Sequence, residues 1–543
     1  MNPSDSPLRT RSGNSTQASR LDRLVRSLGG YSSLMAAAMS LTGLTSVLCP
    51  DCFGQDNTAA STLRVKSQLV ILDPAVTTKD GRVVTNLNRD DFSIFEDGVE
   101  QEIRYFSVPG PSDRIPETPR KDKFGKDDWG DSPLTLLVLD ALNTPFDEIA
   151  YSRQQANKYL SAQPELLNQP TTILWLDDAG IHPIAPLTRV RQELLRALQS
   201  ERPTLPGKLA RGAGVERLSS SLAALQQIAL FSRGSKGGKQ IVWIGRSFPG
   251  VDGTQLGKEQ TSLLNRAVSS TLDLLLTARA AIYVVDPALN LEPPADRIST
   301  SGNPQTISPF SSADPFLHSF SFTSFVDQSG GKYFYGGNDL NNEIASSIDR
   351  GTHFYTIGYV PSSPIEDGRY RKIEIRLKNS NLQVQSKQGY YPTEISQAAP
   401  NERDLRFDLH EAAVSRMPYN SIGVAIRSCG FQADTKTVTC EVIVYNHSLT
   451  ATDAENGEEH ASIVSVFGAL DQSAVLLGNS VSAVSFKLPS NPGANSYSLL
   501  RVHLTVPSRT ASLRVVVRDI DGRIGTADLN SAMFAQINAA HIF

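Results

Sequence analysis

The sequence predicts a mixed α/β fold, in which a doubly wound, mostly parallel sheet carries a small N-terminal β module and a C-terminal β-sandwich. Between residues 133 and 360, short apolar runs alternate with helical stretches, as in parallel strands covered on both faces. Residues 62–107 contain short apolar runs separated by turn signals. From about residue 400 onward, alternating strand patterns are spaced by turn residues, which favours a sandwich.

Length and charge narrow the class of protein. The chain has 543 residues, which at about 150 residues per domain suggests three or four domains. Hydrophobic residues make up 40% and charged residues 20%, so neither a disordered chain nor an integral membrane bundle is expected. Lys and Arg total 52 against 56 Asp and Glu, a net charge of -4 that argues against a nucleic-acid partner.

The first 55 residues are predicted to be an export signal. Residues 1–30 are rich in Arg, and residues 34–48 form an uncharged apolar run that is shorter than the roughly 20 residues of a membrane span. Cys52 and Gly54 stand at the small-residue positions before a cleavage site after Gly54. We therefore expect a periplasmic, cell-envelope or extracellular protein. The alternative is an uncleaved anchor, and only then would the protein contact a membrane.

The N-terminal β module is expected at residues 62–107, where KDG (79–81) and EDG (96–98) are turn signals between apolar runs. A linker is expected at 108–132, because four prolines and dense mixed charge occur together there.

The predicted α/β domain covers residues 133–392. Its inner strands are LTLLVLD (134–140), TTILWLD (171–177), KQIVWIG (239–245) and AAIYVVD (280–286). Helices are expected at 146–160, 189–199, 215–231, 258–279 and 339–350. In such sheets, functional residues gather where the parallel strands end.

The C-terminal domain, 400–543, is predicted to be a β-sandwich and to hold one disulfide. Signal cleavage would remove Cys49 and Cys52 and leave Cys429 and Cys440. A turn centred on residues 434–435 would place these two cysteines directly opposite each other on neighbouring antiparallel strands. An exported protein with such a pair is a disulfide candidate. Two reduced, half-buried thiols are the alternative.

The sharpest functional signal is Asp140, which follows the first inner strand and precedes the oxygen-bearing side chains of Asn143 and Thr144. An acidic residue and hydroxyl oxygens in such a loop can bind a hard divalent cation. Asp140 capping the next backbone N–H groups is the other interpretation. The order of elements resembles a von Willebrand factor A (VWFA) domain. LLVLDALNTPFDE, DDFSIFEDGVEQEI, PLTRVRQELLRAL and QGYYP together resemble the VWFA-related domain of acidobacterial exported proteins over about residues 62–392.

The resemblance implies a metal-ion-dependent adhesion site with the pattern D-x-S-x-S, a Thr in a second loop and an Asp in a third. Asp140, Thr144 and Thr188 match ligand positions, whereas Leu142 replaces a Ser and Gly245-Arg246-Ser247 stands where the third-loop Asp is expected. We therefore predict a degenerate site that binds Mg²⁺ or Ca²⁺ weakly or not at all, and no other cofactor. Asn143, Arg246 and Ser247 would then form an interaction edge.

The leading functional hypothesis is an exported, non-enzymatic interaction protein of the adhesion type, whose partner is a protein, an extracellular matrix component or an envelope component. No catalytic residues are assigned. Ser247 lacks the G-x-S-x-G context because Pro249 occupies the last position, and His410-Glu411 lacks a second His at zinc-site spacing. The alternatives are an envelope-associated hydrolase and a structural component of an envelope assembly.

Overall fold

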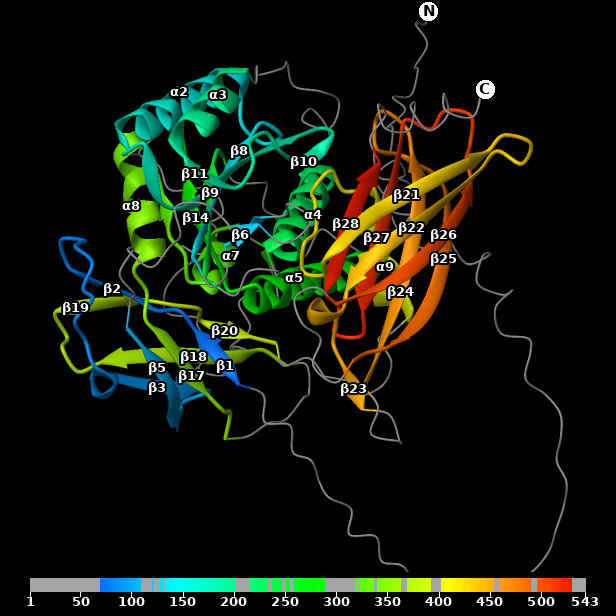
Figure 1. Ribbon diagram of the computed structural model, residues 1–543. Helices are drawn as coiled ribbons and strands as arrows, with labels where there is room; N and C mark the ends of the chain where they lie inside the picture. Colours follow the sequence, from blue (N-terminus) through cyan, green and yellow to red (C-terminus); the bar gives the residue numbers. More distant parts are fainter. Residues whose placement is uncertain are drawn as a thin grey trace, which may run out of the picture. The chain divides into compact units, whose positions relative to one another are not determined.

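The structure is a computed structural model, shown in Figure 1. It describes residues 69–108, 120–121, 127–129, 132–200, 214–232, 237–246, 251–252, 258–288, 319–320, 322–335, 339–362, 369–391, 402–453, 459–489 and 496–529. Contacts group Ser67–Phe543 into one compact unit. The predicted signal at 1–55 lies outside the described residues. No helix in the described ranges is both long and apolar enough to cross a membrane.

A mixed sheet with a parallel majority organises the α/β part. Its strand order is β10-β9-β8-β12-β14-β16, and β11 pairs with β9. The parallel strands are β8 (Leu134–Asp140), β9 (Leu166–Asp177), β12 (Lys239–Ile244), β14 (Ala280–Val285) and β16 (Tyr333–Phe334). The antiparallel strands are β10 (Gly180–Pro183) and β11 (Thr188–Val190). The chain builds outward from β8 to β9 and then returns to add β12 on the other side of β8. The strand order therefore reverses between β8 and β12.

Helices cover both faces of this sheet, because the strands are apolar on both sides (Figure 1). α2 (Phe146–Ala162), α3 (Arg191–Ser200) and α8 (Leu340–Thr352) pack against one face, which carries Leu137, Leu139, Trp175, Val242 and Ile244. α4 (Gly214–Ser232), α5 (Lys258–Thr277) and α7 (Phe322–Ser329) pack against the other, which carries Leu136, Val138, Leu174, Ile241 and Trp243. The alternation of neighbouring residues between faces is the two-residue period of a strand.

The N-terminal strands pair with a distant part of the chain. β1 (Val70–Leu72) and β5 (Ile103–Ser107) flank β17 (Thr356–Tyr359). β3 (Phe92–Glu96) lies between β4 (Val99–Gln101) and β18 (Arg371–Leu377), which also pairs with β20 (Gly389–Tyr390); β2 (Ala75–Thr78) pairs with β19 (Leu382–Gln385). The β module therefore has two segments, and residues 356–390, which the sequence assigned to the α/β domain, belong with residues 70–107.

Short elements complete this region. A 3₁₀ turn covers Arg89–Asp91. Inside the predicted linker, β6 (Arg120–Lys121) pairs with β7 (Asp127–Asp128). β13 (Val251–Asp252) pairs with β15 (Ser319–Phe320).

The C-terminal region, predicted to be a β-sandwich, begins with a helix, α9 (Glu402–Val414), that the sequence analysis did not locate. Its buried residues Leu409, Ala412 and Ala413 pack in the same core as α4 and α5, so tertiary contacts favour a helix that its weak periodicity does not indicate. Two antiparallel sheets follow and share one apolar core. One contains β21 (Val424–Gln432), β22 (Thr437–Tyr445) and β26 (Tyr497–Thr505); the other contains β23 (Thr452–Asp453), β24 (Glu459–Leu470), β25 (Leu476–Lys487), β27 (Ser512–Asp519) and β28 (Ile524–Leu529). A 3₁₀ turn, Asn446–Ser448, follows β22.

Candidate functional site

The candidate site lies where β8 ends at Asp140 and β12 ends at Ile244, at the point where the strand order reverses. In open α/β sheets this position leaves a crevice, because the chains leaving the two strands turn to opposite faces. The sequence predicted a site here from Asp140, Thr144 and Thr188, with Asn143, Arg246 and Ser247 as an interaction edge, and the structure shows how the described members of this set are arranged.

The Asp140 carboxylate is fully buried and accepts hydrogen bonds on both oxygens. The backbone N–H groups of Leu142 and Asn143 donate to Oδ1 at 3.1 and 2.9 Å. Trp243 Nε1 and Asn143 Nδ2 each donate to Oδ2 at 3.0 Å. Burial raises the pKa of Asp140 to about 6, and these hydrogen bonds oppose that shift. The carboxylate therefore caps backbone N–H groups of the loop that follows it, as in the second interpretation above. It also holds β12 through Trp243.

Asn143 is buried rather than presented at an edge. Besides its bonds to Asp140, its Nδ2 donates to Ser221 Oγ on α4 at 3.0 Å. Its Oδ1 is buried and has no hydrogen-bond partner among the described residues. The prediction that Asn143 belongs to an exposed interaction edge is wrong, since the side chain ties the loop after β8 to α4.

Thr144 holds the segment that follows β12. Its Oγ1 accepts a hydrogen bond from the backbone N–H of Arg246 at 2.9 Å. Gly245 adopts φ 153°, and a Cβ there would lie 2.6 Å from Thr144 Oγ1 and 2.8 Å from Asp140 Cβ. A side chain at 245 is excluded on both counts. Glycine at position 245 therefore allows the loops after β8 and β12 to pack closely against each other.

Arg246 forms an ion pair with Glu148 in the first turn of α2. Its Nε donates to Glu148 Oε2 at 2.6 Å, and a second guanidinium nitrogen donates to Oε1. The Arg246 side chain is 40% exposed and that of Glu148 19%, so the pair lies at the surface of the edge. This pairing raises the pKa of Arg246, and Asp286 and Asp147 add attraction from nearby. The Arg246 guanidinium is therefore a positive charge that lies among the carboxylates of Glu148, Asp147 and Asp286.

Asp286 follows β14 and extends this neighbourhood. Its Oδ2 accepts a hydrogen bond from the Tyr333 hydroxyl at 2.9 Å, and its Oδ1 accepts one from the backbone N–H of Ala288 at 2.9 Å. Burial raises the pKa of Asp286, whereas these hydrogen bonds and the charge of Arg246 lower it. Sequence reasoning missed Glu148, Trp243 and Asp286 as parts of this edge. The available signal was their place at strand ends or in the first turn of a helix.

Thr188 does not lie at this edge. It pairs with Thr171 across β9, whereas Asp140 pairs with Leu176. Five residues of strand separate these positions, or roughly 16 Å at about 3.3 Å per residue. The Thr188 hydroxyl accepts a hydrogen bond from Val190 N at 3.0 Å instead. Its assignment as a ligand beside Asp140 and Thr144 is therefore wrong, because the hairpin after β9 returns Thr188 toward the start of that strand.

Within the described ranges, no three His, Cys, Asp or Glu side chains are grouped so that they could hold a metal ion. Ser247 lies outside the described residues. Cys429 and Cys440 are directly opposite in the β21–β22 pairing, as their spacing predicts, and a disulfide joins them.

Comparisons with known proteins give no family. No family model and no curated protein matches the chain. Similar solved structures include proximal thread matrix protein 1 from the mussel byssus, at 10% identity and TM-score 0.19 over 29% of this chain and 38% of that one. The TFIIH p34 N-terminal domain follows at 15% and 0.21, over 39% and 95%, and human COPII-coat protein Sec24c at 8% and 0.21, over 49% and 44%. These TM-scores do not define a fold.

Proposed function

We propose that this chain is an exported, non-enzymatic interaction protein built around a VWFA-like domain, and that it contacts a protein partner at the carboxyl edge of its parallel strands without a metal ion. The partner class is a protein of the extracellular matrix or of the cell envelope. The order of the elements supports the VWFA-like assignment: the first inner strand ends in Asp140, the next strand leads into an antiparallel hairpin, and the strand order then reverses.

The observation that carries this proposal is the Arg246–Glu148 pair. Where an A domain would hold a divalent cation beside Asp140, this edge has a guanidinium bound by a carboxylate through two hydrogen bonds. The guanidinium remains 40% exposed, so it can also pair with a carboxylate of a partner. Asp140 cannot take that role, since its oxygens are buried and already accept five N–H contacts.

The disulfide supports export. A disulfide between Cys429 and Cys440 persists in an oxidising compartment and is rare in a reducing one. The signal at 1–55 stays a prediction, and a mature chain that begins near residue 55 in N-terminal sequencing of the exported protein would support it. A mature chain that retains residues 34–48 would indicate a membrane anchor.

The test compares the capture of envelope proteins by four purified full-length chains: wild type, Arg246→Glu, Glu148→Arg, and the double exchange of both. We expect Arg246→Glu to lose the captured partner at least tenfold. The double exchange should restore the intramolecular pair but not the capture, because the exposed charge is then carried from a different position. Capture by the wild type should be unchanged in EDTA.

The matched control is Arg501→Glu. Arg501 forms an exposed pair with Glu441 at 3.1 Å on the sheet of β22 and β26, so this substitution makes the same charge change away from the edge. Equal loss in Arg501→Glu and Arg246→Glu would indicate a general charge effect. Full capture by the double exchange would mean that the pair acts only in folding. Either result would contradict the proposal that the carboxyl edge of the parallel strands is the contact surface, and would favour a structural role for the β regions.

A further inference from the structure

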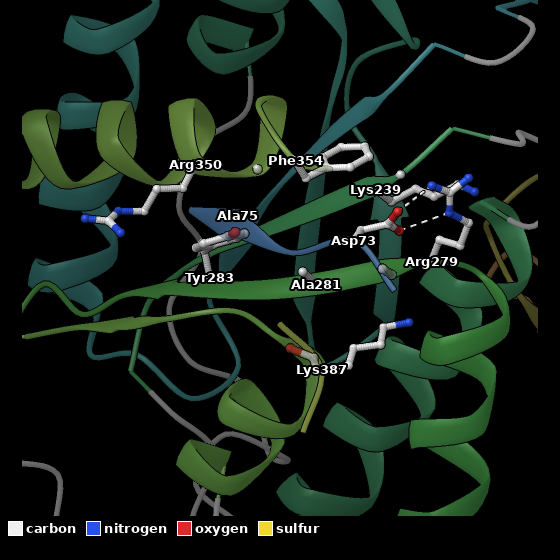
Figure 2. Close-up of a pocket in the computed structure, with 13 residues that line it drawn as sticks. Asp73, Ala75, Lys239, Arg279, Ala281, Tyr283, Arg350, Phe354 and Lys387 are labelled. Atoms are coloured by element: carbon white, nitrogen blue, oxygen red, sulfur yellow. Dashed lines mark hydrogen bonds and ion pairs between the residues drawn. The ribbon is translucent and has the colours of Figure 1, made fainter. Parts of the chain in front are cut away.

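A cavity of about 30 Å³ lies where β12 and β14 begin, and the charged side chains around it contact other parts of the chain (Figure 2). Figure 2 shows Arg279 beside Asp73, and Arg279 Nε donates to Asp73 Oδ2 at 2.9 Å. Lys387 Nζ donates to the backbone oxygen of Leu276 at 3.0 Å. The main chain of β25 differs, because one side of this strand has no partner strand among the described residues.

β25 forms one edge of its sheet. It pairs with β24 in an antiparallel ladder that is continuous from Gly478 to Lys487, and β26, the next strand along the chain, joins the other sheet. No residue of β25 is buried, whereas Ile463 and Phe467, which face it from β24, are 2% and 1% exposed. The outer side of β25 is therefore open to solvent.

The opposite edge of the same sheet, β28, is covered by the chain itself. The segment before β21 runs along it. Thr526 N donates to the backbone oxygen of Tyr419 at 2.9 Å, and Ile422 N donates to the backbone oxygen of Ile524 at 3.3 Å. The described chain therefore protects one edge of this sheet and leaves the other without a partner.

The hydrogen bonds to β24 show which main-chain groups of β25 point outward. Leu488 N donates to the backbone oxygen of Glu459 at 2.8 Å, which continues the register in which Lys487 faces His460. Along an antiparallel ladder, residues that exchange hydrogen bonds with the partner strand alternate with residues whose groups point away from it. The even-numbered residues from 478 to 488 therefore bond to β24. The residues that direct their N–H and C=O groups to the open side are Asn479, Val481, Ala483, Ser485 and Lys487.

β25 lacks the features that normally keep an open edge from pairing with another strand. Such edges are usually short, or carry charged residues, proline or a bulge. β25 has 12 residues, no proline and one charged residue, Lys487 at its end. By contrast, β26, which ends the other sheet, presents Arg501 and His503 on its exposed face. The β25 edge is therefore suited to main-chain pairing.

We propose that β25 pairs with β25 of a second copy of this chain, in an antiparallel arrangement across a two-fold axis at Ala483. In this register Ala483 faces its own copy, Val481 faces Ser485, and Asn479 faces Lys487. The outward-facing residues of the two copies then bond to one another. They form about ten main-chain hydrogen bonds, which is as many as a typical protein–protein interface contains.

A second copy fits this edge because the strand is complementary to itself. The two Lys487 side chains lie at opposite ends of the paired segment, so no like charges face each other. The side chains that meet near the axis, those of Val481, Ala483 and Ser485, are small, and the 47% of Val481 that is exposed in the single chain would be covered in part. Pairing across a two-fold axis uses both open β25 edges and therefore stops at two copies.

The test places like charges on the axis. Ala483→Lys and Ala483→Glu each set identical charges directly opposite each other in the dimer, whereas the position is exposed in the single chain. Sedimentation velocity of the full chain from about 1 to about 100 µM measures the oligomeric state. We expect the wild type to dimerise in this range and each variant to dimerise at least tenfold more weakly. An equimolar mixture of the two variants should associate again, because a lysine then faces a glutamate.

The matched controls are Ala433→Lys and Ala433→Glu, because Ala433 is exposed in the turn between β21 and β22. They make the same changes away from β25 and should dimerise like the wild type. A wild type that stays monomeric over the whole range would overturn the proposal, and so would Ala483 variants that dimerise as well as the controls. A mixture of the two Ala483 variants that stays monomeric would overturn the pairing about Ala483.

Hydrogen exchange gives a second measurement that requires no variant. In the single chain, β24 protects the amide protons of the even-numbered residues of β25, and those of the odd-numbered residues are open to water. Dimerisation should slow exchange over residues 479–487 as the protein concentration rises and leave the turn at 433–436 unchanged. Exchange over residues 479–487 that is the same at low and high concentration would overturn the proposal even if the Ala483 variants fail to fold.

Discussion

The indole Nε1 of Trp243 donates a hydrogen bond to Oδ2 of Asp140 at 3.0 Å, and this contact joins the last residue of β8 to the adjacent strand β12. Both side chains are fully buried. A carboxylate at the end of a parallel strand usually suggests chemistry at the sheet edge. Here it is an acceptor that fixes two strands and one loop.

Asp140→Asn should destabilise the fold. The amide that replaces one carboxylate oxygen cannot accept the hydrogen bonds made there, so buried N–H groups lose their acceptor. We expect a loss of about 1–3 kcal/mol in the free energy of unfolding, measured by urea denaturation at pH 7. Combining this substitution with Trp243→Phe in a double-mutant cycle should give a coupling energy of about 1 kcal/mol or more. Strict additivity would mean that the Trp243–Asp140 contact contributes nothing.

Mg²⁺ and Ca²⁺ should bind weakly or not at all at this edge. The Asp140 oxygens already accept hydrogen bonds from N–H donors. Thr188 pairs with Thr171 and so lies several residues of strand β9 away from Asp140. Hard cations require several oxygen ligands in one place. Isothermal titration of the wild type and of Asp140→Ala with either ion is the measurement. Micromolar binding that disappears in Asp140→Ala would restore a working metal-dependent adhesion site.

Asp273 on α5 should make stability depend on pH. Burial raises its pKa to about 7, and its Oδ1 is buried without a hydrogen-bond partner among the described residues. A carboxyl whose pKa is higher in the folded than in the unfolded state contributes stability at low pH, and that contribution is lost as the pH rises through about 7. Asp273→Asn cannot ionise, so its stability relative to the wild type should increase by about 1–3 kcal/mol between pH 5 and pH 8.5.

The control for this prediction is Asp434→Asn, since Asp434 is exposed in the turn between β21 and β22. Its difference from the wild type should stay nearly constant over the same range. Urea denaturation at each pH gives the free energies. A pH-independent difference for Asp273→Asn would show that Asp273 is ionised in the folded protein.

The disulfide between Cys429 and Cys440 should stabilise the C-terminal sheets by closing a short loop in the unfolded chain. Replacing both cysteines by Ala should cost about 2–3 kcal/mol in the free energy of unfolding. Mass spectrometry of the exported protein without reduction should show the linked peptides. Two thiols that react with an alkylating agent in the folded, exported protein would contradict the prediction.

Much of the central sheet could be predicted from sequence because its strands are continuous apolar runs. LTLLVLD gives β8 with its observed bounds, and KQIVWIG and AAIYVVD each extend one residue beyond β12 and β14. Periodicity also located α2 and α5 to within about two residues. Strands that are buried on both faces consist almost entirely of apolar residues, and such runs can be recognised from the local sequence alone.

The candidate site was predicted only in part, because sequence order does not show at which end of a strand a residue lies after a hairpin. Thr188 follows β10 along the chain, yet its pairing with Thr171 takes it away from Asp140. The Arg246–Glu148 pair joins residues almost a hundred positions apart, and no local pattern couples them. The pairing of residues 356–390 with residues 70–107 could not be predicted for the same reason, since no local pattern couples two segments so far apart in the sequence.

That last pairing has a consequence for how the chain is made. β5 ends at Ser107 and its neighbour β17 begins at Thr356, so the whole α/β domain is inserted between two strands of the β module. Among the first strands to leave the ribosome, β1 and β5 pair with β17 and β2 pairs with β19, so these three strands lack their partners until the domain that follows them has emerged. Loops of this length make such contacts slow to form. In a nascent chain, β1, β2 and β5 are therefore open strand edges that a chaperone would need to protect.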